Sequence, residues 1–176
     1  MKKNILISTG GSGGHVVPAK ILYEHLSKVS NVSISTDKRG LKYLDKSICQ
    51  FKIIDTPKLN NIFLLPLNLP IILFLTLKLI FFLKDKKIEK IISIGGYMSL
   101  PIILAGRVLK LDIYLIEPNH ILGRANKYFL NFCKKIFCYA ENIKNFPIAF
   151  KNKIIVIYPL IQKYIYEIKP SNKTKD

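Results

Sequence analysis

The sequence predicts an α/β fold in which helices cover both faces of a doubly wound, parallel β-sheet. Short apolar runs alternate with helical segments along the chain, from Asn4–Thr9 to Ile154–Ile157. Continuous apolar runs of this length are typical of parallel strands that are buried on both faces. Two of these runs end in a pair of glycines that leads into a helix. Sheets of this class bind ligands at the carboxyl ends of their strands, so the glycine pairs mark the expected site.

Strands and helices follow one another in a regular order. Strands are expected at Asn4–Thr9, Val32–Thr36, Phe51–Asp55, Lys90–Ile94, Ile113–Glu117, Ile136–Tyr139 and Ile154–Ile157. Helices are expected near Val17–Lys28, Arg39–Ile48, Pro70–Leu83, Ser99–Leu109 and Arg124–Cys133. No repeat or glycine-rich linker interrupts the series, so we expect one domain over residues 1–169 and a loose polar tail over 170–176.

Composition favours a cytoplasmic protein that lies beside an anionic surface. The 176 residues carry a formal net charge of +17, and 49% of them are hydrophobic, enough for one well-packed core. An AT-rich genome that over-uses lysine and isoleucine is the alternative source of this charge. Nucleic acid is not an expected partner, because no nucleic-acid-binding motif accompanies the charge. The three cysteines, Cys49, Cys133 and Cys138, lack metal or redox spacing, and no signal peptide, metal or cofactor is expected.

The first glycine-rich turn, Gly10–His15, lies where the first strand leads into the first helix. Glycines permit the positive φ angles of such a turn and let a ligand approach the backbone. The following helix terminus offers unpaired N–H groups to a diphosphate. The candidate binding residues are Gly11, Ser12, Gly13 and Gly14.

His15 stands at the same helix terminus, where the helix dipole lowers its pKa and favours the neutral imidazole of a general base. The alternative is a tight turn that His15 only caps. His25, in the middle of the same helix, is expected to be structural.

Two further motifs follow later strands. The segment Ile94–Pro101 places a glycine pair and a serine at the start of a helix, which makes a second turn suited to an anion. Its candidate binding residues are Gly95, Gly96 and Tyr97. Glu117 and Asn119 end the next strand, so a carboxylate and an amide are expected at the same sheet edge. Asn126 and Lys127, farther along, either contribute to the site or form a helix surface.

A long apolar segment, Ile62–Leu83, precedes a cluster of lysines that begins at Lys84. Prolines near its start and a lysine inside it argue against a membrane span, and a helix over Pro70–Leu83 is only about 21 Å long. We therefore favour a helix that lies in the membrane interface, with a buried crossover helix and a true span as alternatives. The expected membrane contacts are Phe74, Leu77, Lys78, Phe81 and Phe82.

These motifs resemble, in the same order, those of the MurG family of bacterial glycosyltransferases. Thr9–Pro18 is similar to the first glycine-rich loop of the family, and Ile94–Pro101 is similar to the second. Glu117–Lys127 is similar to its His-Glu-Gln-Asn and Gly-x-x-Asn motifs, although Ile116 replaces the histidine and Pro118 the glutamine. The resemblance implies a Rossmann-like domain equivalent to the N-terminal, acceptor-binding half of a GT-B glycosyltransferase.

The resemblance also implies a function. The family transfers N-acetylglucosamine from its UDP donor to the polyprenyl-diphosphate sugar lipid I, in peptidoglycan synthesis, at the cytoplasmic face of the inner membrane. By this resemblance His15 is the base, both glycine loops hold the acceptor diphosphate, and Glu117 and Asn119 line the sugar cleft. Inverting transfer of this kind needs a base but no covalent nucleophile.

The family holds its sugar nucleotide mainly in a second domain, which we do not expect in this chain. Ile161 stands where the family has an arginine that helps to hold the donor. The chain is therefore expected either to act with a separate donor-binding subunit or to be a fragment that is inactive alone. A non-catalytic membrane-binding module and a different nucleotide-dependent enzyme on the same sheet are the remaining interpretations.

Overall fold

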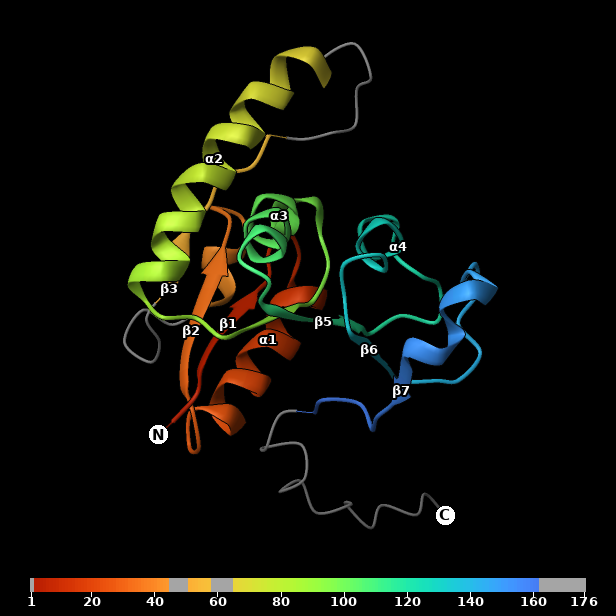
Figure 1. Cartoon of the computed structure of the whole chain (residues 1–176). Helices are drawn as coiled ribbons and strands as arrows, with labels where there is room; N and C mark the ends of the chain where they lie inside the picture. Colours follow the sequence, from red (N-terminus) through yellow and green to blue (C-terminus); the bar gives the residue numbers. More distant parts are fainter. Residues whose placement is uncertain (1, 45–50, 58–64, 162–176) are drawn as a thin grey trace, which may run out of the picture.

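The computed structural model describes residues 2–44, 51–57 and 65–161, and within them seven parallel strands form one sheet. The strand order is β3-β2-β1-β4-β5-β6-β7 (Figure 1). The strands are β1 (Asn4–Ser8), β2 (Asn31–Thr36), β3 (Phe51–Ile53), β4 (Lys90–Ser93), β5 (Asp112–Glu117), β6 (Lys135–Cys138) and β7 (Ile154–Val156). The sheet is doubly wound, as the sequence predicts.

Helices cover both faces of this sheet (Figure 1). One face carries α1 (Gly13–Leu26), and the other carries α2 (Leu65–Asp85), α3 (Leu100–Val108) and α4 (Arg124–Phe129). Neighbouring residues of β1 enter different cores, because successive side chains of a strand point to opposite faces. Leu6 packs in the core beneath α2 and α3, whereas Ile7 packs against Val16 and Ala19 of α1.

The order of the strands reverses between β1 and β4. From β1 the chain continues outward to β2 and β3, and from β4 it continues outward on the other side to β5, β6 and β7. β1 and β4 are hydrogen-bonded neighbours, with Ser8 opposite Ser93. The loops that follow these two strands therefore leave the sheet side by side, at the topological switch point where open α/β sheets bind ligands.

The predicted strands are all present with similar bounds, but the helices differ more. α1 begins at Gly13, inside the glycine loop, because Ser12 has an extended backbone and acts as its N-cap. Of the predicted helix near Arg39–Ile48, the described part contains a 3₁₀ turn, η1 (Gly40–Tyr43), and the stretch 45–50 lies outside the described residues. The predicted tail, 170–176, also lies outside them. Two further 3₁₀ turns are η3 (Tyr97–Ser99) and η4 (Ile148–Lys153).

The helix α2 is longer than the sequence predicts, because it begins before Pro70 and continues through it. Pro70 has no N–H, so the helix lacks one main-chain hydrogen bond there. Its 21 residues extend over about 31 Å. In the described part of the chain, its stretch Leu67–Asp85 is long and apolar enough to cross a membrane. The predicted length of about 21 Å was therefore wrong.

One side of α2 packs on the protein and the other side does not. The buried side chains recur at helical spacing and are Ile72, Thr76, Leu79 and Leu83. The exposed apolar side chains are Leu67, Leu69, Ile71, Leu73, Phe74, Leu77 and Phe81. The amino-terminal part of α2 extends beyond the rest of the molecule (Figure 1). The carboxyl-terminal part attaches α2 to the core.

Two leucines of α2 test this attachment. Leu83 is 1% exposed and Leu73 is 61% exposed. We expect Leu83→Ala to lower the free energy of unfolding by about 2–5 kcal/mol, because it leaves a cavity in the core. The matched control, Leu73→Ala, should change it by less than about 0.5 kcal/mol. Urea denaturation followed by circular dichroism measures both, and equal effects would contradict the orientation of α2.

Candidate functional site

The two glycine loops meet beyond the carboxyl ends of β1 and β4. Gly11, Gly95 and Gly96 have φ angles of 83°, 88° and 86°, in the left-handed region that L side chains rarely adopt. A Cβ on Gly96 would lie 3.8 Å from the carbonyl oxygen of Gly10, so the two loops are close neighbours. The sequence places glycines at these positions because the turns demand them.

The first glycine loop runs into the first turn of α1, where main-chain N–H groups are left without a helical partner. The N–H groups of Gly13 and Gly14 have no hydrogen-bond partner within the described segments, as expected for the first turn of a helix. The N–H of Gly11 is already used, because it donates to Oδ1 of Asp37 at 2.9 Å. Of the predicted binding loop, Gly13 and Gly14 therefore offer free amides to an anion.

His15 lies in the first turn of α1 and is half-buried. Its Nδ1 lies 3.3 Å from the hydroxyl of Ser12. Burial lowers the pKa of His15, and the negative charge of Glu117 acts in the opposite direction. The direction agrees with the sequence analysis, and burial of the ring is the largest cause of the lowered pKa. A neutral imidazole near pH 7 is the form that accepts a proton.

Glu117 is 1% exposed and does not lie open to solvent. Its Oε1 accepts hydrogen bonds from the main chain and side chain of Asn119, at 3.2 and 2.9 Å. Its Oε2 accepts from the amide of Gly123 at 2.7 Å and from Nδ2 of Asn126 at 3.0 Å. These donors hold the loop between β5 and α4 in place, and Asn119 itself is exposed at the sheet edge.

Asn126 connects this loop to the second glycine loop. It is buried, and its Nδ2 also donates to the carbonyl oxygen of Ile116 at 3.1 Å. A Cβ on Gly95 would lie 3.3 Å from the same Nδ2. Lys127, the next residue, lies on the exposed surface of α4. Of the two residues that the sequence left open, Asn126 lies against the site and Lys127 does not.

The sequence analysis missed Asp37 and Arg39, which follow β2. Oδ1 of Asp37 accepts from the amides of Gly11 and Gly40, both at 2.9 Å, and its Oδ2 accepts from Nε of Arg39 at 3.0 Å. Nη2 of Arg39 donates to the hydroxyl of Tyr97 at 2.7 Å. Burial raises the pKa of Asp37, but these donors outweigh it and the pKa is lowered, so the carboxylate stays charged. Polar residues directly after a strand were the signal that could have identified both.

The described residues contain no alternative centre of metal or thiol chemistry. No cluster of three or more His, Cys, Asp or Glu side chains that could hold a metal ion occurs among them. Cys133 and Cys138 are free and buried, and burial raises the pKa of Cys138 to about 11. Such a thiol is a poor nucleophile. Cys49 lies outside the described residues.

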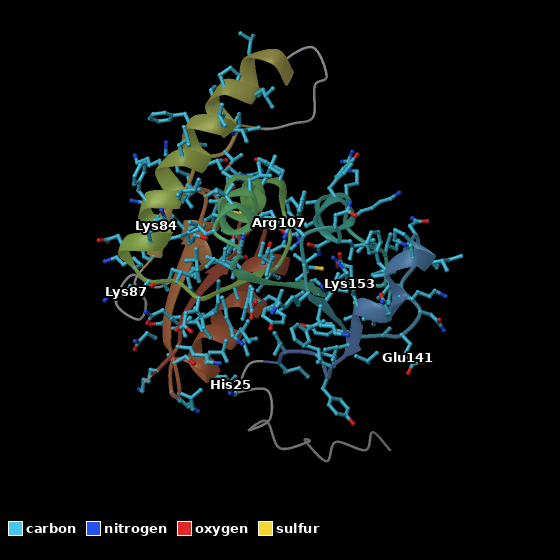
Figure 2. The ribbon with its side chains drawn as sticks, viewed as in Figure 1. His25, Lys84, Lys87, Arg107, Glu141 and Lys153 are labelled. Atoms are coloured by element: carbon cyan, nitrogen blue, oxygen red, sulfur yellow. The ribbon has the colours of Figure 1, made fainter. Side chains whose placement is uncertain are left out.

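The residues predicted to contact a membrane all lie on α2 and do not belong to the glycine loops. Phe74, Leu77, Lys78 and Phe81 are exposed. Phe82 packs against the core instead, and Nζ of Lys52 lies 5.4 Å from the centre of its ring. Figure 2 shows Lys84 and Lys87 near the carboxyl-terminal end of α2.

Known proteins are similar to this chain in sequence and in fold. The glycosyltransferase family 28 N-terminal domain matches residues 5–138. The UDP-N-acetylglucosamine--N-acetylmuramyl-(pentapeptide) pyrophosphoryl-undecaprenol N-acetylglucosamine transferase of Pelagibacter ubique (strain HTCC1062) is 50% identical over 100% of this chain and 50% of its own length. The transferase of the same name from Rickettsia felis is 36% identical, over 99% of this chain and 48% of its own.

Among solved structures, Acinetobacter baumannii MurG superposes with a TM-score of 0.74 at 24% identity, which shows a shared fold. The match covers 94% of this chain and 48% of that one. The chain thus spans about half the length of the curated relatives it matches.

Burial and the charge of Glu117 act on the pKa of His15 in opposite directions, and this can be tested. We expect the pKa of His15 to lie below that of a free histidine, and Glu117→Gln to lower it further, because the substitution removes the negative charge that raises it. Titration of the His15 ring protons by NMR measures the change. Glu141→Gln, which removes an exposed carboxylate on another part of the molecule (Figure 2), should leave it unchanged. A higher pKa in Glu117→Gln would contradict the assignment.

Proposed function

Because the chain belongs to the glycosyltransferase family 28 N-terminal domain family, we propose that residues 1–169 form the acceptor-binding domain of a membrane-surface N-acetylglucosaminyltransferase. The proposed acceptor is the pyrophosphoryl-undecaprenol sugar in the name of the Pelagibacter relative, and the proposed donor is UDP-N-acetylglucosamine. Transfer between them converts lipid I to lipid II.

One observation carries this proposal: two glycine loops adjoin at the switch point, with a half-buried histidine at the start of the first helix. The amides of Gly13 and Gly14 are suited to one end of a diphosphate. The positive-φ pair Gly95 and Gly96 leaves room for the other end, because neither residue places a side chain in the turn.

His15 acts as the general base in this proposal. The acceptor hydroxyl attacks the anomeric carbon of the donor sugar, its proton passes to the neutral imidazole, and UDP leaves with the electron pair of the broken bond. A single displacement of this kind inverts the anomeric centre and needs no covalent intermediate. Glu117 stabilises the imidazolium that forms, since its negative charge raises the pKa of His15.

Donor binding belongs, in this proposal, to the part of the relatives that this chain does not cover. That part is supplied either by the same polypeptide or by a partner subunit. Ile161, where the family has an arginine expected to help hold the donor, agrees with a donor site built mainly by other residues.

We further propose that α2 lies in the membrane interface at the cytoplasmic face. Leu79 and Leu83 hold the helix on the core, which favours an interfacial position over a span. Burial of four or five of the exposed Leu, Ile and Phe side chains contributes roughly 1.5–3 kcal/mol each. The exposed lysines of the helix and its end, Lys78, Lys84, Lys86 and Lys87, add about 1 kcal/mol apiece on an anionic leaflet.

The proposed reaction is tested with a chimera that joins this chain to the second half of the Pelagibacter relative. We expect transfer of N-acetylglucosamine to the lipid acceptor, and His15→Ala should reduce kcat by about 100-fold or more, because the base is lost. His25→Ala is the matched control, since His25 is exposed at the other end of α1 (Figure 2) and should leave kcat unchanged.

Full activity of His15→Ala would exclude His15 as the base. Vesicle binding without any turnover in the chimera would favour a non-catalytic membrane module instead.

The membrane surface is tested with vesicles of phosphatidylglycerol and phosphatidylethanolamine. We expect binding that weakens as salt is added, and a loss of at least roughly 100-fold in Phe74→Ser/Phe81→Ser, because two apolar anchors are removed. The control is Tyr128→Ser on α4, since Tyr128 is 74% exposed and Phe81 is 73% exposed. Equal binding by both variants would remove α2 from the proposed interface.

A further inference from the structure

An arginine joins the two glycine loops. Nη2 of Arg39, which directly precedes η1, lies 2.7 Å from the hydroxyl of Tyr97 and would lie 3.5 Å from a Cβ on Gly11. The guanidinium carbon lies 5.5 Å from the centre of the Tyr97 ring. Gly11 belongs to the first loop and Tyr97 follows the glycine pair of the second. The guanidinium therefore lies at the junction of the two loops, where the diphosphate is proposed to bind.

The position of this cation is set before any ligand arrives. Nε and Nη2 of Arg39 both contact Oδ2 of Asp37, at 3.0 and 2.9 Å. Oδ1 of the same carboxylate accepts from the amides of Gly11 and Gly40. Asp37 is buried, whereas the side chain of Arg39 is 46% exposed. A ligand that approaches the loops thus meets the guanidinium and not the carboxylate.

The guanidinium keeps part of its donor set unused. Arginine carries five N–H donors in a planar fork, and Nε and Nη2 are engaged by Asp37 and Tyr97. Nη1 has no partner in the portion of the chain that the structure describes. A planar fork with free N–H groups matches the oxygens of a phosphate, and a fixed fork loses little conformational entropy when it binds.

Within the described residues, the neighbouring lysine, Lys38, does not contact the glycine loops as Arg39 does. A contact with the loops is therefore not a general property of the basic residues in this part of the surface. Nζ of Lys38 pairs with Oδ2 of Asp55 at 2.9 Å, and its side chain is 79% exposed. It makes no contact with either glycine loop among the described contacts.

We propose that Arg39 is a phosphate-binding residue of the acceptor site and selects diphosphate over monophosphate acceptors. The amides of Gly13 and Gly14 hold one phosphate and Nη1 of Arg39 binds the other, so a ligand with a single phosphate uses only part of the site. Arg39 also positions the loops, because it links Gly11, through Asp37, to Tyr97. This inference rests on the proposed function and names the group that recognises the second charge.

The test uses the full chain and two soluble probes, geranyl diphosphate and geranyl monophosphate, in isothermal titration calorimetry. We expect Arg39→Gln to weaken binding of the diphosphate by about 10-fold or more and binding of the monophosphate by less than about 3-fold. Arg39→Lys keeps a cation beside Asp37 but loses the planar fork, and it should lie between wild type and Arg39→Gln. Lys38→Gln removes the same charge one residue away and should change neither affinity by more than about 2-fold.

The outcomes separate the inference from the proposed function. Diphosphate binding that is equal in wild type and Arg39→Gln overturns the role of Arg39 and leaves the glycine loops as the site. Equal loss for both probes also overturns it, because a purely structural role moves both alike. A wild-type chain that does not bind geranyl diphosphate overturns the inference and the proposed site together. If circular dichroism shows that Arg39→Gln does not fold, Arg39→Lys is used in its place. An Arg39→Lys variant that binds the diphosphate as tightly as wild type refutes the proposed role of the Arg39 guanidinium.

Discussion

The pairing of β1 with β4 is the constraint on which the site depends. These strands are distant in sequence, and their parallel hydrogen bonds place Ser8 opposite Ser93 at the centre of the sheet. Each strand is followed by a glycine loop, so the pairing determines how far apart the loops lie. A hydrogen bond of 2.9 Å between the hydroxyls of Ser8 and Ser99 adds a side-chain link at the same edge. Everything proposed for acceptor binding requires this juxtaposition.

Two buried carboxylates, Asp37 and Glu117, fix the conformation of the loops at the site by accepting hydrogen bonds from loop amides. Asp37 holds Gly11, Gly40 and Arg39, and Glu117 holds the amides of the loop between β5 and α4. Each carboxylate replaces lost hydration with several N–H donors, which is how a buried charge is tolerated. The two differ in partner, because Asp37 is paired with a cation, whereas the donors to Glu117 among the described residues are all neutral. The charge of Glu117 therefore acts on His15, whereas the charge of Asp37 orients the guanidinium of Arg39.

Much of the fold could be predicted, because it depends on local patterns. Apolar runs identified all the strands, and the glycine pairs identified both loops, because backbone conformations with positive φ leave a direct signature in residue type. The helix α2 was predicted too short, because Pro70 was expected to begin the helix and the helix instead continues through it. Val17 was expected to open α1, but the backbone of Ser12 starts it earlier. Asp37 and Arg39 were not identified, because their position directly after a strand is a weak signal and their partners, Gly11 and Tyr97, lie far away in the sequence.

The sequence by itself determined the doubly wound sheet, the two glycine loops, the position of His15 beside the first loop and the apolar character of α2. These features follow from residue types and their spacing, which act over a few residues. Only the tertiary structure decided that Glu117 is buried, that Phe82 faces the core while Phe81 faces outward, and that Arg39 links the loops. Those facts arise from contacts between segments far apart in the chain, such as Arg39 with Tyr97. The direction of a side chain depends on which neighbours pack against it or pair with its polar atoms, and the tertiary fold determines which neighbours lie within reach.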